Sequence, residues 1–100
     1  MAVMELGMDY FESLVAEGKT VIDFYATWCG PCKMMNPILE ELSSEVPDVK
    51  FFKIDVDKEL ELAMRFNVMS VPTLLVVEDG EIIDKTIGLI SKKELLNIIY

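Results

Sequence analysis

The chain has 100 residues, of which 52% are hydrophobic, and its 9 Lys and Arg against 18 Asp and Glu leave a formal charge of −9 at pH 7. This length predicts a single domain over residues 1–100, with a core large enough to fold without a metal or a disulfide. The negative charge repels phosphates and anionic lipid headgroups, so nucleic acids and membrane surfaces are excluded as expected partners.

The opening segment predicts a weak strand, a helix and then a strong strand. Residues 2–6 give the weak strand signal. Asp9 is suited to cap a helix that ends before Gly18, and residues 20–26 have the apolar character of a buried strand. The apolar stripe expected on this helix consists of Tyr10, Phe11, Leu14 and Val15.

The middle of the chain continues the alternation of helix and strand. Residues 31–46 keep a helical spacing of apolar side chains, and Pro37 predicts a kink because proline lacks an N–H and crowds the preceding turn. Residues 49–56 predict a second buried strand, and the apolar positions between 60 and 66 favour a short helix.

The last third of the chain predicts a hairpin followed by a helix. Two strand-like runs, 73–77 and 81–87, flank the dipeptide Asp-Gly at 79–80, which suits the positive φ angles of a hairpin turn. Ser91 and Glu94 have the spacing of a capping box, and apolar residues follow at helical spacing. These signals complete the set of expected elements.

The order of these elements predicts the architecture. Two parallel strands need a crossover, which the helix at 31–46 supplies between the strands at 20–26 and 49–56. The hairpin, in contrast, is antiparallel. We therefore expect an α/β fold with a central mixed β-sheet flanked by helices on both faces.

Several features bear on the compartment. The first residues contain no basic segment followed by a longer apolar stretch, so no secretory signal is expected, although a mature chain whose signal had been removed would look the same. No uncharged apolar run approaches the roughly 18 residues of a membrane span. We expect a cytoplasmic protein, and in a reducing compartment a cysteine pair favours redox or metal chemistry over a static crosslink.

The two cysteines of the chain are Cys29 and Cys32. A structural zinc site takes about four Cys and His ligands, and iron–sulfur clusters need as many, but the chain has no histidine. No metal site is therefore expected, and a zinc ion shared across a dimer remains the alternative. At the junction of a strand and a helix in a βαβ pattern, a Cys-x-x-Cys pair indicates redox chemistry.

The start of the helix within this motif favours a thiolate at Cys29. Unpaired backbone N–H groups and the positive end of the helix dipole lie there. Pro31 suits the first helical turn, and Gly30 has no side chain to obstruct an approaching partner. Cys32, inside the first turn, is expected to face the protein and to be less accessible.

Asp23 interrupts the apolar run at 20–26. If its strand is central, the following helix covers it, and desolvation raises the pKa of the carboxyl. Such a group is a competent general base for Cys32, directly or through one water. The alternative is a solvated carboxylate at a strand edge, and the cysteine pair downstream favours the buried base.

Taken together, these residues resemble the thioredoxin family over essentially the whole chain. The run Trp-Cys-Gly-Pro-Cys-Lys at 28–33 is similar to its active-site motif without a gap, and Asp-Phe-Tyr-Ala at 23–26 resembles its strand with a buried acid. Pro37 and the run Val-Pro-Thr at 71–73 resemble its helix-kinking proline and its cis-proline loop.

The resemblance implies roles for individual residues. Cys29 would be the nucleophile, Cys32 the resolving thiol and Asp23 the proton acceptor for Cys32. Trp28 would cover the site, although an ordinary core tryptophan is the alternative. Pro72 would lie against the cysteines in cis.

Three further residues take their implied roles from the same family. The Val71 backbone would pair with an extended segment of the substrate. Gly88 would leave room for partners, although it is also suited to a turn that ends a strand. Lys53 would lie near the buried acid, with a solvated strand-edge cation as the alternative.

The resemblance further implies a protein disulfide reductase that receives electrons from a thioredoxin reductase and passes them to disulfide-containing proteins. It would work through its own dithiol, without another cofactor, and we expect a monomer. The dipeptide between the cysteines lacks the histidine typical of protein disulfide isomerases, which disfavours an oxidase or isomerase role. The alternative is a non-catalytic module that binds a partner with an affinity set by its dithiol.

Two features leave the contacts with partners open: residues 69–70 differ from those of many relatives, and the location of three methionines is ambiguous. Met69 and Ser70 stand before Val71 where many relatives carry other residues, so partner preference is left open. Met34, Met35 and Met69 form either a soft contact surface or, as helical spacing favours, part of the core.

Overall fold

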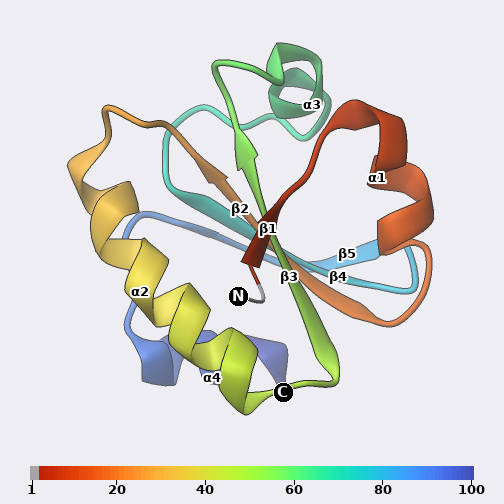
Figure 1. Ribbon diagram of the computed structural model, residues 1–100, viewed down its shortest axis with the longest axis vertical. Coiled ribbons are helices and arrows are strands. Elements are labelled where there is room, and N and C mark those ends of the chain that lie inside the picture. The colour runs from red at the N-terminus through yellow and green to blue at the C-terminus, as the bar shows by residue number, and fades with distance from the viewer. Residues whose placement is uncertain (1–2) are drawn as a thin grey trace.

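The computed structural model describes residues 3–100, which form five strands and four helices (Figure 1). The predicted strand at 2–6 is present from Val3, and Ala2 lies outside the described residues. In chain order the elements are β1 (Val3–Glu5), α1 (Met8–Val15), β2 (Lys19–Tyr25), α2 (Gly30–Glu45), β3 (Val49–Asp55), α3 (Leu60–Arg65), β4 (Thr73–Glu78), β5 (Glu81–Ile87) and α4 (Lys92–Ile99).

The strands form one mixed sheet in the order β1-β3-β2-β4-β5. β3 is parallel to both β1 and β2, and α2 makes the crossover from β2 to β3. β4 runs antiparallel to β2 and to β5. The predicted mixed sheet is confirmed, and β2, which leads to the cysteines, lies at its centre.

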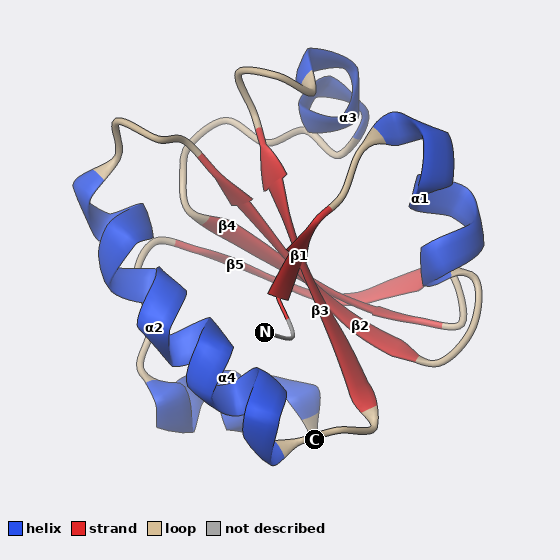
Figure 2. Ribbon diagram, in the orientation of Figure 1, coloured by secondary structure: helices blue, strands red, loops and turns tan. Residues whose placement is uncertain are grey.

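Helices cover both faces of this sheet, as predicted (Figure 2). The core on one face packs residues of α2 and α4 against the sheet, and the core on the other face packs residues of α1 and α3. Side chains alternate between faces along a strand, so Val21 enters the first core whereas Ile22 and Phe24 enter the second. Asp23, two residues after Val21, therefore lies on the α2 face.

Two local motifs predicted from the sequence are present. Asp79 and Gly80 have φ angles of 50° and 85° and connect β4 to β5, which fits the predicted hairpin turn. Ser91 and Glu94 form the capping box of α4, each side chain accepting a hydrogen bond from the other residue's backbone N–H. Within residues 3–100, no helix has the length and apolar character needed to cross a membrane.

The prediction for the start of α1 is wrong. The N-cap is Gly7 rather than Asp9, which lies exposed in the first turn. The backbone N–H of Leu6 still pairs with the carbonyl of Lys53, so the chain leaves the sheet at Gly7 and the helix begins immediately afterwards. The predicted stripe is also narrower than expected: Phe11 and Val15 are buried, whereas Tyr10 is 69% exposed and Leu14 is 36% exposed.

Candidate redox site

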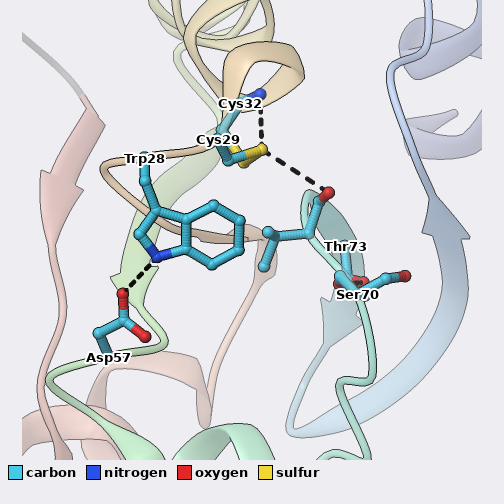
Figure 3. The surroundings of a disulfide bond; sticks show 7 residues. Trp28, Cys29, Cys32, Asp57, Ser70 and Thr73 are labelled. Carbon is cyan, nitrogen blue, oxygen red and sulfur yellow. Dashed lines mark hydrogen bonds between the residues drawn. A yellow bond between two sulfur atoms is a disulfide. The ribbon is translucent and has the colours of Figure 1, made fainter.

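Cys29 is the N-cap residue of α2, at the point where the chain leaves the centre of the sheet. Its Sγ accepts a hydrogen bond of 3.2 Å from the backbone N–H of Cys32 (Figure 3). Pro31 lies in the first turn and has no N–H to offer. The sulfur therefore takes the place of a capping oxygen, where an N–H donor and the helix dipole both favour negative charge.

Cys29 and Cys32 are joined in a disulfide, with their Cα atoms 5.3 Å apart, so the structure represents the oxidised form. Both residues are buried, with 5% and 4% of their surface exposed. Exposure alone therefore does not separate an accessible from a shielded sulfur, contrary to expectation. The two cysteines differ instead in the cavities that they line.

Cys29 lines an open pocket of about 550 Å³ between the cysteine motif and residues 68–71. Trp28, Gly30 and Pro31 line the same pocket, and Cys32 does not. The exposed Met69 contributes a flexible apolar side chain to its wall. An extended chain that entered this pocket would meet Cys29 first.

The loop before β4 forms the opposite wall of this pocket. The Val71–Pro72 peptide bond is cis, Pro72 is buried, and the carbonyl oxygen of Val71 lies 3.7 Å from Cys29 Sγ. The Thr73 hydroxyl donates a hydrogen bond of 2.7 Å to the Ser70 carbonyl, which closes the loop on itself (Figure 3). The loop thus presents a backbone carbonyl directly beside Cys29 Sγ.

Trp28 lies at the surface rather than in the core. It is 69% exposed, and its indole N–H donates a hydrogen bond of 2.8 Å to the carboxylate of Asp57 (Figure 3). Asp57 follows β3, and the carboxyl ends of the parallel strands β2 and β3 meet at one edge of the sheet. The alternative of an ordinary core tryptophan is therefore wrong, and Asp57 is a site residue that the sequence analysis missed.

On the inner side, Cys32 and Asp23 line a separate cavity of about 190 Å³. Asp23 is only 2% exposed, and its Oδ1 has no hydrogen-bond partner among the described residues. Desolvation raises the pKa of Asp23 from 3.8 to about 7, while the charge of Lys53 lowers it and that of Glu5 raises it. The alternative of a solvated strand-edge carboxylate is wrong.

The comparisons with known proteins agree with this geometry. The thioredoxin family profile matches residues 2–100. The chain belongs to the thioredoxin family. It is 44% identical over 100 residues to a thioredoxin of Bacillus subtilis, covering 99% of this chain and 96% of that protein. It is 39% identical over 97 residues to a thioredoxin of Chlamydia trachomatis, covering 97% and 95% of the two chains.

A solved structure gives the same result. Mitochondrial thioredoxin 3 of Saccharomyces cerevisiae, in its oxidised form, matches with a TM-score of 0.89 and 42% identity, over 97% of this chain and 92% of that one. Thioredoxins are oxidoreductases that act by thiol–disulfide exchange through their own cysteine pair, without a cofactor, and the Cys29–Cys32 pair fits this chemistry. Within residues 3–100, no group of three or more Cys, Asp and Glu is placed to hold a metal ion.

The remaining residues predicted by the thioredoxin resemblance have definite positions. Gly88 follows β5 with a φ of 93°, which fits a turn that ends a strand, and its N–H donates a hydrogen bond of 2.8 Å to the Pro72 carbonyl. Lys53 is half-buried and lines the Asp23 cavity from β3, which lies between β1 and β2, so it is near the buried acid and not at an edge of the sheet. α2 continues through Pro37, and the kink stays a prediction.

The three methionines divide between the two expected locations. Met35 is fully buried in the core between α2 and the sheet. Met34 and Met69 are 61% and 85% exposed, so they belong to the surface. The expectation that methionines at helical spacing are core residues therefore holds for only one of the two on α2.

Proposed function

We propose that this thioredoxin is a general protein disulfide reductase in which Cys29 attacks and Cys32 resolves. The observation that carries the proposal is the division of the site into two cavities. Cys29 Sγ caps α2 beside the larger open pocket, and Cys32 lines the smaller cavity together with Asp23. One side of the site suits the entry of a substrate, and the other suits the storage of a proton.

In the first step, the Cys29 thiolate of the reduced protein attacks one sulfur of a substrate disulfide. The new bond joins Cys29 Sγ to that sulfur, and the second substrate sulfur leaves as a thiolate that takes a proton from solvent. The Cys32 N–H that now contacts Cys29 Sγ supports the negative charge before the attack. Because the best attacking thiol ionises near ambient pH, a moderate stabilisation suffices.

In the second step, Cys32 loses its proton to the Asp23 carboxylate, directly or through one water, and attacks Cys29 Sγ. The mixed disulfide breaks, the substrate sulfur leaves with the electron pair, and the Cys29–Cys32 disulfide forms. The two protein thiols are oxidised and the substrate disulfide is reduced. A pKa of about 7 for Asp23 supports this role, since a base is most effective when its pKa lies near the working pH.

Substrate binding is assigned to the walls of the outer pocket. The Val71 backbone would pair with an extended substrate segment, with Pro72 holding the loop in place. Trp28 offers an exposed aromatic face, and Gly30 adds no side chain that would obstruct the approach. Gly88 supports the loop through its bond to the Pro72 carbonyl, and it would leave room for a partner.

We further propose that the chain works as a single-domain monomer in the cytoplasm and that a thioredoxin reductase returns Cys29–Cys32 to the dithiol. Disulfide-containing proteins are its proposed substrates. The cysteine pair supports a reducing compartment, because such a pair serves there as a reagent rather than as a crosslink. The charge of −9 disfavours nucleic acid as a partner.

Reduction of insulin tests this function. Catalytic amounts of the protein should accelerate the precipitation of insulin in the presence of a dithiol reductant, and Cys29→Ser should abolish the acceleration. If the fully reduced wild type gave no acceleration, the reductase would be refuted and the non-catalytic binding module favoured. Titration of insulin binding to Cys29→Ser, with both redox forms of the wild type for comparison, would then test that module.

The order of attack is tested separately by trapping. Cys32→Ser keeps the nucleophile and lacks the resolving thiol, so it should accumulate mixed disulfides with insulin or with proteins of a cell extract. Cys29→Ser is the matched control and should accumulate none. If Cys29→Ser formed the adducts instead, the assigned roles would be reversed. The trapped proteins would also identify the reductase and the substrates.

A further inference from the structure

Three charged side chains form a row across neighbouring parallel strands beside the Asp23 cavity. Glu5 of β1 is paired in register with Lys53 of β3, and Lys53 is paired with Asp23 of β2. Residues paired across adjacent parallel strands point to the same face of the sheet. The charges therefore alternate negative, positive, negative across this face, with the buried Asp23 at the inner end and the exposed Glu5 at the outer end.

Tyr25 contacts two residues of this row, Glu5 and Lys53. It lies on the same face as Asp23, two residues further along β2, and its hydroxyl donates to both carboxylate oxygens of Glu5, at 2.6 and 2.9 Å. The Nζ of Lys53 lies 5.5 Å from the centroid of the Tyr25 ring, within the range of a cation–π contact. Tyr25 thus holds the Glu5 carboxylate with its hydroxyl and the Lys53 ammonium with its ring.

Other charged groups near Asp23 are few. Lys33 of α2 lines the cavity, and Asp55 lies on β3 in register with Tyr25. The neighbour of Asp23 on β4 is the apolar Leu74. Desolvation raises the pKa of Asp23 to about 7. Small changes in the electrostatic field of the neighbouring charges therefore change the fraction of Asp23 that is ionised at neutral pH.

We propose that Tyr25 is a positioning residue that fixes the Glu5 carboxylate at the outer end of this row, and that the charge of Glu5 held there helps to set the pH at which Cys32 resolves the mixed disulfide. Glu5 does not contact the reacting sulfurs; it acts through the electrostatic field at Asp23, against that of Lys53. Burial and the bond to Glu5 raise the pKa of Tyr25, so its hydroxyl stays protonated as the donor. The inference rests on the proposed role of Asp23 as the base.

The size of the effect follows from the spacing of the strands. Two strand spacings place the carboxylates of Glu5 and Asp23 roughly 10 Å apart. At an effective dielectric constant of about 50, between about 20 near a protein surface and about 80 in bulk water, one unit charge at that distance moves a titration by about 0.5 pH unit. Glu5→Gln removes the negative charge and leaves that of Lys53, so the carboxylate of Asp23 is favoured and resolution should begin at lower pH.

Ellman's reagent separates the two steps, because attack by Cys29 releases one thionitrobenzoate and resolution by Cys32 releases a second. Stopped-flow traces over a range of pH should show the midpoint of the second release about 0.5 pH unit lower in Glu5→Gln than in the wild type. The matched control is Glu81→Gln, which removes an exposed charge from β5 at the opposite edge of the sheet. It should leave the midpoint unchanged.

The same assay in the Tyr25→Phe background tests the connection. Phe keeps a ring beneath Lys53 and removes the hydroxyl that holds Glu5, so Glu5→Gln should then shift the midpoint by less than half as much. An equal shift in both backgrounds would refute the role of Tyr25. If Glu5→Gln did not shift the midpoint in the otherwise wild-type protein, or if Glu81→Gln shifted it equally, the role of Glu5 would be refuted.

Asp23→Asn distinguishes failure of this inference from failure of the proposed mechanism. If Asp23→Asn abolishes the pH-dependent second release and Glu5→Gln leaves it unshifted, only the positioning role is wrong. If Asp23→Asn retains the wild-type midpoint, Asp23 is not the base, and the inference fails with that role.

Discussion

Replacing Asp23 by Asn should stabilise the oxidised protein, and the gain should grow as the pH rises. Burial raises the pKa of Asp23 from 3.8 to about 7, so between these values the folded state keeps a proton that the unfolded state has lost. The wild type therefore loses stability as the pH rises from about 4 to about 7, and stays at the lower level above that. The amide of Asn has no charge to bury and escapes this loss.

The magnitude follows from the same values. At about 1.4 kcal/mol for each pH unit between the two pKa values, burying the carboxylate costs about 4 kcal/mol at alkaline pH. Near pH 4 the cost is only about 0.6 kcal/mol, because this pH lies just above the unfolded pKa of 3.8 and the folded carboxyl is still protonated. The stabilisation by Asn should therefore be about 4 kcal/mol larger near pH 9 than near pH 4.

Guanidinium denaturation of the oxidised proteins near pH 4, 7 and 9 measures this difference, because the intact disulfide removes the cysteine thiols from the titration. The matched control is Glu17→Gln, which neutralises an exposed acid between α1 and β2. The change in the free energy of unfolding caused by Glu17→Gln should not show the pH dependence expected for Asp23→Asn. If Asp23→Asn changed stability equally at all three pH values, the carboxyl would not be desolvated and the argument for a buried base would be refuted.

Three further predictions concern the site and the scaffold. Lys53→Met removes the charge that lowers the pKa of Asp23, so the midpoint of the second Ellman release should move to higher pH; an unchanged midpoint would contradict this. Leu42→Ala empties a fully buried core position and should cost about 2 to 5 kcal/mol in chemical denaturation, whereas Leu14→Ala, at a half-exposed position, should cost less. Gly80→Ala puts a side chain at a φ of 85° in the hairpin turn and should lower stability by about 1 kcal/mol; an equal or higher denaturation midpoint would contradict this.

Much of the fold could be predicted because the signals are local. The Asp79-Gly80 turn and the capping box of Ser91 and Glu94 depend on residues within four positions of each other, and both are present. The start of α1 could not be predicted in the same way. The backbone of Leu6 pairs with that of Lys53, and this long-range contact decides where the chain leaves the sheet.

Some features of the site could also be predicted from the sequence, and others depend on long-range contacts. The burial of Asp23 could be predicted because it follows from the apolar run around it and from the helix that returns over its strand. The bond from Trp28 to Asp57 had a usable signal, since both residues follow adjacent parallel strands. The placement of Glu5 beside Tyr25 had no sequence signal. It depends on the register of β1 against β3, which neither segment determines by itself.

The pH dependence of alkylation at Cys29 shows directly whether the N-terminus of α2 stabilises the thiolate. In Cys32→Ser, iodoacetamide reacts with one thiol, and its rate follows the fraction of thiolate at the N-terminus of α2. We expect a midpoint well below that of the same protein unfolded in guanidinium, where a free thiol titrates at about 8.5. Coincident midpoints for the folded and unfolded protein would contradict it.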